Sequence, residues 1–283
     1  MHLFSQIPYQ LSNQYIESFY HPGQATTMLG MLKYSNDFQL AQGLNQFWYK
    51  DSSTTTIDNT GFTLRKTFII QKPTTKNALA AAGKVNFDKI SLFMPHVIPS
   101  DLERVNLYKS IESKVTLPVT FRARQLSVKT SPEKPRYIIV RFQTNKDGNQ
   151  EVNSSIFGYC DLKIMYIMLN QERYPAGDYN LSFPTHQFSR TYRDASVFSE
   201  KFYGMKDLIT KSNITSSDYK DLYPLMVFDV SRKSEKLKSS VVDVQIKAIF
   251  NAAVPADSEA FAVVISDKFL HFQSDGNKLN VVY

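Results

Sequence analysis

The segment SSVVDVQIKAIF, residues 239–250, constrains the fold more than any other stretch, because apolar and polar side chains alternate along it. The apolar face is made by Val242, Val244, Ile246, Ala248 and Phe250. The other face carries Val241, Asp243, Gln245 and Lys247. Alternation with a period of two is typical of a β-strand with one buried face and one wetter face. We therefore expect a strand whose wet face is a binding site, a subunit interface or plain solvent-facing surface.

Further strands are predicted beyond residue 115, where short β-branched and aromatic runs follow one another. They are LPVTFRA (117–123), PRYIIVRFQT (135–144), LKIMYIML (162–169), PLMVFDV (224–230) and EAFAVVISDKFLHF (259–272). The third run is nearly all apolar, as expected for a strand that is covered on both faces. The pair Asp147-Gly148 predicts a hairpin turn after the second run. In the fourth run, alternation directs Asp229 to a wet or interfacial face, opposite Phe228 and Val230.

Helices are predicted to interrupt this β pattern. Ser100 and Glu103 form a capping box at the start of a helix over Ser100–Lys114. A second helix is expected from Gln187 to Tyr203, and Gly204 stands where a C-terminal cap would fall. Its apolar stripe is best interpreted as core packing, and consists of Phe188, Tyr192, Ala195, Phe198 and Phe202. A third short helix is expected near Thr215, with Asp218 three residues on.

The first 95 residues are less regular. Three runs there are expected to be strands: NQFWYK (45–50), FTLRKTFIIQK (62–72) and VNFDKISLFMPHV (85–97). Taken together, these patterns predict a mainly β protein with helices inserted in long loops, and they do not favour alternating βαβ units.

Catalytic and metal-binding patterns are not found in the sequence. The five histidines form no close pair, the single cysteine excludes cysteine-based zinc spacing, and no glycine-rich phosphate loop is present. We expect no cofactor, no metal and no enzymatic activity. Cys160 is expected to be a buried thiol. The N-terminus does not resemble a signal peptide, and the apolar runs are too short to span a membrane, so a soluble intracellular protein with no membrane contact is expected.

Two further features suggest contacts. The net charge is +7, and the densest basic group is Arg232, Lys233, Lys236 and Lys238. This group fits a solvated turn, or non-specific contact with nucleic acid. In the loop NQERYPAGDY, Tyr174 and Tyr179 either contact a ligand or pack a turn set by Pro175 and Gly177.

These residues, read in order, resemble the double jelly-roll major capsid proteins of Polinton-like and adintovirus-like elements. The resemblance is carried by SLFMPHVIPSD, LPVTFRARQ, SPEKPRYIIVRFQT and LKIMYIMLNQERYPAGDYNLSF, and then by the long run from PLMVFDV to ISDKFL. It covers residues 84–283 almost continuously. Residues 1–70 are similar to the family more loosely, chiefly in LFSQ and NQFWYKD.

The resemblance implies a mainly β, double jelly-roll capsid subunit. The expected division is a partial N-terminal jelly roll over 1–98, a connecting helix over 99–115 and a C-terminal jelly roll over 116–283. The N-terminal roll is expected to lack its opening strands, which would expose strand edges and suggests a degraded or domesticated copy.

The resemblance also implies a function. The chain would be a virion protein that assembles in the host cell as pseudo-hexameric homotrimers with other capsid proteins, and Asp243, Gln245 and Lys247 would be candidates for the interface. The basic group would face the genome. Two alternatives remain: a jelly-roll module that binds a carbohydrate or protein partner without assembly, and a cupin-type metalloenzyme.

Overall fold

The computed structural model describes residues 4–11, 14–69, 96–125, 135–145, 152–204, 214–231, 242–274 and 279–282. The chain forms two compact units. The first contains residues 1–8, 18–69 and 122–268, and the second contains 9–17, 70–121 and 269–283. Because each unit combines segments that are far apart in sequence, the units do not test the predicted boundaries at residues 98 and 115, which stay predictions.

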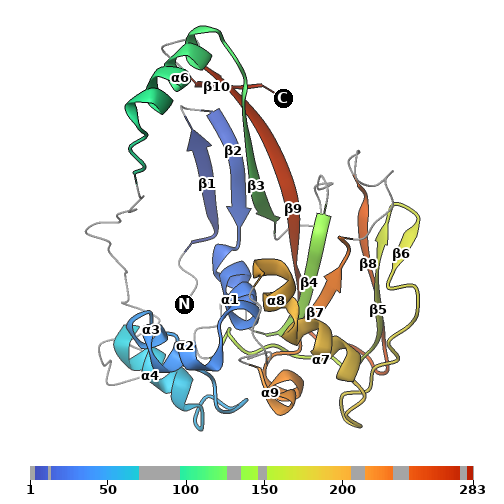
Figure 1. Ribbon diagram of the computed structural model, residues 1–283. Coiled ribbons are helices and arrows are strands. Elements are labelled where there is room, and N and C mark those ends of the chain that lie inside the picture. The colour runs from blue at the N-terminus through green and yellow to red at the C-terminus, as the bar shows by residue number, and fades with distance from the viewer. Residues whose placement is uncertain are drawn as a thin grey trace. The chain divides into compact units, whose positions relative to one another are not determined.

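The fold is mainly β, with helices inserted between the strands (Figure 1). The strands are β1 (Gln6–Leu11), β2 (Gln14–Tyr20), β3 (Leu117–Gln125), β4 (Pro135–Thr144), β5 (Leu162–Leu169), β6 (Glu172–Tyr174), β7 (Met226–Asp229), β8 (Val244–Phe250), β9 (Ser258–Ser274) and β10 (Leu279–Val282). The helices are α1 (Pro22–Lys33), α2 (Asn36–Leu40), α3 (Gln42–Asn45), α4 (Thr60–Ile69), α6 (Asp101–Glu112), α7 (Ser189–Ser196), α8 (Phe198–Tyr203) and α9 (Ser216–Asp221).

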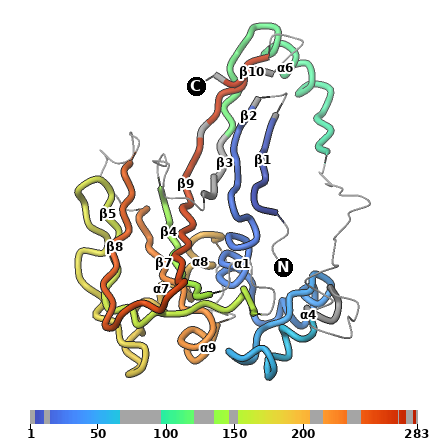
Figure 2. The backbone as a smooth tube through the Cα atoms, turned by 180° about the vertical axis from the view of Figure 1, so that it is seen from behind, coloured from blue at the N-terminus to red at the C-terminus, as the bar shows by residue number. Residues whose placement is uncertain are grey.

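The described strands form three sheets. One sheet has the order β10-β9-β4-β7, and β3 also pairs with β9. A second has the order β6-β5-β8, and its strands β5 and β8 run side by side in the view from behind (Figure 2). The third is the pair β1-β2. Strand β4 is antiparallel to both of its neighbours, with Ile139 opposite Val227 of β7 and opposite Val263 of β9.

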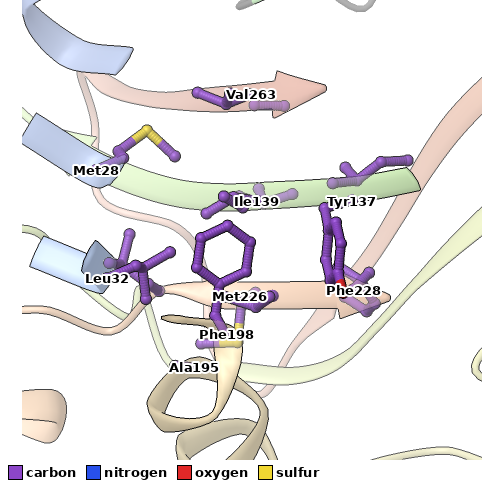
Figure 3. Close-up of a cluster of buried hydrophobic side chains, with 14 of the residues drawn as sticks. Met28, Leu32, Tyr137, Ile139, Ala195, Phe198, Met226, Phe228 and Val263 are labelled. Carbon is purple, nitrogen blue, oxygen red and sulfur yellow. The ribbon is translucent and has the colours of Figure 1, made fainter. Parts of the chain in front are cut away.

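Strand β4 is buried on both faces. One face carries Ile138, Val140 and Phe142, and the ring of Phe142 meets Phe250 of β8 edge-on at 5.5 Å. The other face carries Tyr137 and Ile139, which lie among side chains of α1, α7 and α8 (Figure 3). The core of the first unit therefore has two layers, one between the sheets and one between a sheet and the helices.

The alternation predicted for residues 239–250 is confirmed from residue 242 onwards. Val242 and Val244 are buried, and Ile246, Ala248 and Phe250 are half-buried against the core. Asp243, Gln245 and Lys247 are exposed. In β5, which was expected to be covered on both faces, Met165, Ile167 and Leu169 are buried, whereas Ile164, Tyr166 and Met168 are half-buried.

The capping signals are confirmed in the structure. Ser100 and Glu103 form the capping box of α6, and Thr215 and Asp218 form that of α9. Gly204 ends α8 in the left-handed conformation, with φ of 70°. The helix predicted from Gln187 to Tyr203 is instead two helices, α7 and α8, which are separated at Val197.

Two of the strand predictions for the first 95 residues are wrong. Residues 62–69 of FTLRKTFIIQK belong to helix α4, because the Asn59 side chain accepts a hydrogen bond from the Phe62 N–H at 2.9 Å and caps the helix. Within NQFWYK, α3 ends at Asn45, and Phe47 has a φ of 56°. The greater part of VNFDKISLFMPHV, and the turn at Asp147-Gly148, lie outside the described residues.

A buried ionic network holds residues 49–65 against the β core of the first unit. The Asp51 side chain is fully buried, and it accepts hydrogen bonds from Arg65 Nη2 (2.5 Å), Asn153 Nδ2 (2.7 Å) and the Tyr223 hydroxyl (3.0 Å). The Asp51 N–H donates to the same hydroxyl at 3.1 Å. Burial, with the Asp51 charge next, raises the pKa of Tyr223.

Replacement of Asp51 should be strongly destabilising. Asp51→Ala leaves the Arg65 charge unpaired, and it removes the acceptor of two buried donors, Asn153 Nδ2 and the Tyr223 hydroxyl. We expect a loss of about 3–5 kcal/mol in the free energy of unfolding, measured by urea denaturation. Asp58→Ala, in the same segment but exposed, is the matched control and should cost less than about 1 kcal/mol. Equal losses in the two variants would contradict the importance of this network.

A second buried charge lies on β4. Arg141 is fully buried, and its guanidinium lies 4.2 Å from the ring centre of Phe157 and 4.9 Å from that of Phe261. Nη1 donates to the Ser154 carbonyl at 3.5 Å, while Nε and Nη2 have no hydrogen-bond partner among the described residues. Burial lowers the pKa of Arg141 to about 9, so the side chain is still charged at neutral pH.

Arg141→Met should raise the free energy of unfolding at pH 7 by about 1–3 kcal/mol, because an apolar side chain of similar length avoids the cost of burying the charge. Above pH 9 the difference in the free energy of unfolding between Arg141→Met and the wild type should become smaller. The folded wild type releases its proton there while the unfolded chain still holds it, so the stability of the wild type rises with pH. Urea denaturation of both proteins from pH 7 to 10 measures this, and a less stable Met variant at pH 7 would contradict it.

Candidate functional site

A cavity of about 190 Å³ lies in the first unit, beside the residues that follow β6. The loop after β6, helices α7 and α8, strand β7 and the start of β4 line it. Its lining residues are Tyr137, Tyr174, Pro175, Tyr179, Arg190, Arg193, Asp194, Phe198, Lys201, Val227, Phe228 and Asp229.

The floor of the cavity is apolar and rigidly packed. Tyr137, Phe198 and Phe228 are buried, and the rings of Tyr137 and Phe198 meet edge-on at 5.2 Å. These three side chains belong to the cluster between β4, β7 and the helices (Figure 3). Because such packing fixes side-chain rotamers, the floor provides a fixed surface for whatever enters the cavity.

Tyr179 connects the loop to helix α7. Its hydroxyl donates to Asp194 Oδ2 at 3.2 Å, and the guanidinium of Arg190 lies 4.8 Å from its ring centre. Burial, followed by the Asp194 charge, raises the pKa of Tyr179 to about 12. The hydroxyl therefore stays protonated and continues to donate to Asp194 at physiological pH.

The end of β6, which carries Tyr174, and the following loop, which carries Tyr179, are held by their own polar contacts. The Tyr174 hydroxyl donates to Glu172 Oε2 at 2.8 Å, and Arg173 pairs with Asp178 across the loop. The Arg173 guanidinium also lies over the Tyr166 ring of β5 at 4.0 Å. Tyr174 and Tyr179 thus pack a turn and also line the cavity, and ligand contact by them stays a prediction.

Asp229 and Lys201 close another side of the cavity. Asp229 Oδ1 accepts hydrogen bonds from the Ser231 N–H (3.0 Å) and hydroxyl (2.6 Å), and its other oxygen lies 3.9 Å from Lys201 Nζ. Asp229 is exposed, whereas Phe228 and Val230 are buried. The predicted direction of Asp229 is therefore confirmed.

The charged side of this cavity was not predicted from the sequence. Arg190, Asp194 and Lys201 stand four and then seven residues apart, which places them along one face of α7 and α8, next to the buried stripe. That spacing could have identified them, but the loop tyrosines approach from a segment whose position depends on tertiary structure.

The predicted interface residues lie apart from the cavity lining: Gln245 and Lys247 lie on β8, and Asp243 directly precedes it. The Asp243 N–H donates to Asn170 Oδ1 at 2.8 Å, and Gln245 Nε2 donates to Asp243 Oδ2 at 2.8 Å. Among the described strands, β8 pairs with β5 alone and so forms one edge of its sheet. An edge strand with an exposed polar face can contact another chain.

The other positions singled out in the sequence have different outcomes. Arg232, Lys233, Lys236 and Lys238 lie outside the described residues. Cys160 is half-buried, so the expected burial of its thiol is only partial. In the part of the chain that the structure describes, no group of three His, Cys, Asp or Glu residues could hold a metal ion. None of the helices described here is long and apolar enough to cross a membrane.

Apolar side chains are exposed on and beside helix α6 in the second unit. Val97, Ile98, Leu102 and Tyr108 are between 62% and 88% exposed. Leu102, Val105 and Tyr108 recur at helical spacing along α6, and none of the three is buried in the structure. An exposed apolar surface of this kind is typical of a protein–protein contact.

A family model, described as the double jelly roll-like domain, matches residues 71–270. No curated protein matches the chain. The matched range includes the cavity lining and the polar face of β8.

The Tyr179–Asp194 hydrogen bond makes a pH-dependent contribution to stability. Because the pKa of Tyr179 is raised to about 12, the folded chain keeps this proton after the unfolded chain has lost it, so stability falls as pH rises from 10 to 12. In Tyr179→Phe this fall should be shallower than in the wild type. Thermal unfolding from pH 8 to 11.5 measures both slopes, with Tyr9→Phe, at an exposed tyrosine, as the control. Parallel slopes would contradict the raised pKa.

Proposed function

The chain belongs to the double jelly roll-like domain family, and from this premise we propose that it is a non-catalytic structural subunit of the major-capsid type. The family match over residues 71–270 is the observation that carries the proposal, since the double jelly roll is a capsid-type fold. In this proposal three chains associate into a pseudo-hexameric trimer, and trimers contact one another and other capsid proteins in a virion that assembles inside the host cell.

The polar face of β8 supports self-association. A ring of three identical chains requires two different surfaces that fit each other. Asp243 and Lys247 place opposite charges on one exposed face, and Gln245 lies between them. Charges of this kind select partners and orient them, although they add less to the affinity than buried apolar contacts do.

The exposed apolar residues around α6 also support self-association. Leu102 and Tyr108 are 72% and 62% exposed, and their burial against another chain would supply the apolar part of an interface. The net charge of +7 is compatible with non-specific contact between the assembled protein and a nucleic acid genome. In this proposal the basic group at residues 232–238 makes that contact.

A second candidate function is a binding module that acts without assembly. The cavity lined by Tyr174 and Tyr179 favours it, because concave sites with an apolar floor and a few polar groups are typical of small-ligand binding. No observation on the described residues favours the cupin-type metalloenzyme.

Sedimentation velocity of the purified full chain tests assembly. We expect a concentration-dependent species with three times the 32.4 kDa mass of one chain. Lys247→Glu should weaken the trimer by about tenfold or more at low salt, because it reverses the charge that the facing surface of the neighbouring chain has to complement. Lys247→Arg, which keeps the charge, is the matched control and should leave the trimer unchanged. A chain that stays monomeric at the highest soluble concentration would overturn the proposal.

A further inference from the structure

The cavity beside α7 and α8 carries more positive than negative charge. Its lining includes three cations, Arg190, Arg193 and Lys201, and two acids, Asp194 and Asp229. If all five groups have their usual charges, the cavity carries one net positive charge. It therefore has the charge to balance one singly charged anion, and too little to balance a phosphate group that carries about two negative charges at neutral pH.

Both acids are already occupied by neighbouring donors. Asp194 accepts from the Tyr179 hydroxyl at 3.2 Å and from Arg193 at 3.3 Å. Asp229 accepts from the Ser231 N–H and hydroxyl, and Lys201 lies 3.9 Å away. Each carboxylate thus has one of the other two cations close to it, which leaves the charge of Arg190 as the surplus.

Arg190 is placed to receive an anion. It is exposed, its guanidinium lies 4.8 Å from the ring centre of Tyr179, and no described carboxylate forms an ion pair with it. A guanidinium that lies against an aromatic ring is oriented by that contact. Its planar set of N–H donors matches the two oxygens of a carboxylate.

The size and floor of the cavity restrict what carries the anion. A volume of about 190 Å³ is smaller than the roughly 300–1,000 Å³ of pockets that hold drug-sized ligands, so it suits a small body such as a single sugar ring or an amino-acid side chain. Phe198, Phe228 and Tyr137 offer an apolar floor. The Tyr179 hydroxyl already donates to Asp194, so its oxygen can accept a hydrogen bond from a ligand.

We propose that this cavity is a carboxylate-binding site in which Arg190 holds the anion and the aromatic floor receives the body that carries it. Two sources have this chemistry: a free acidic monosaccharide, and an acidic side chain of a second copy of this chain. The site does not depend on trimer formation, because every lining residue belongs to one chain and one unit.

Isothermal titration of the full chain tests the site with two pairs of probes. Glucuronate is compared with glucose, which lacks the carboxylate, and N-acetylglutamate amide is compared with N-acetylglutamine amide. In at least one pair we expect the acid to bind about tenfold or more tightly than its neutral partner, as for a charge-assisted hydrogen bond.

Variants assign the binding to Arg190. Arg190→Gln should weaken binding of the acidic probe about tenfold or more. It should leave the thermal stability of the protein unchanged, because the side chain is exposed. Arg190→Lys keeps the charge but not the planar set of donors. Its affinity for the acid should lie between that of the wild type and that of Arg190→Gln. Arg104→Gln, an exposed arginine on α6 outside the cavity lining, is the matched control and should bind as the wild type does.

The two sources give different results. Tighter binding of glucuronate, with an unchanged sedimentation profile for Arg190→Gln, identifies a free acidic sugar. Tighter binding of the glutamate probe, with a loss of association in Arg190→Gln, identifies a neighbouring chain. A monomeric wild type that binds glucuronate through Arg190 would refute assembly and support this site. Equal binding of acid and neutral probes, or no effect of Arg190→Gln, would overturn the inference.

Discussion

The burial of β4 on both faces is the constraint on which the rest of the first unit depends. A strand with apolar side chains on both faces needs two covering layers, and a single sandwich of sheets supplies one. On one face of β4, Phe142 packs against Phe250 of β8, whereas side chains of α1, α7 and α8 lie beside Tyr137 and Ile139 on the other face. The inserted helices are therefore part of the core, and they are present because the second face of the sheet would otherwise meet water.

The same packing explains where the cavity lies. The apolar stripe of α7 and α8, with Ala195, Phe198 and Phe202, packs against the sheet. A helix that buries one stripe presents the adjoining face to solvent, and on these helices that face carries Arg190, Asp194 and Lys201. The loop after β6 lines the space beside that face. The candidate site is thus formed by the same helices and strands that build the core.

The parts of this fold that could be predicted from sequence are those set by local chemistry. The alternation in β8 and the capping boxes at Ser100 and Thr215 depend on near neighbours, and all three are confirmed. The same reasoning failed for residues 62–69, where the cap at Asn59 favours a helix over β-branched propensity. The cavity could not be predicted, because Tyr179 meets Asp194, fifteen residues away, only after the loop folds back on α7.

The buried ionic network around Asp51 restricts how this chain can change over evolutionary time. Its members come from distant places, with Asp51 and Arg65 early in the chain and Asn153 and Tyr223 far beyond them. A recombination event that exchanged residues 1–69 for those of a relative would bring in a new partner for an unchanged Asn153 and Tyr223. The early segment and the matched domain should therefore be inherited together, and substitutions at these four positions should covary among homologues.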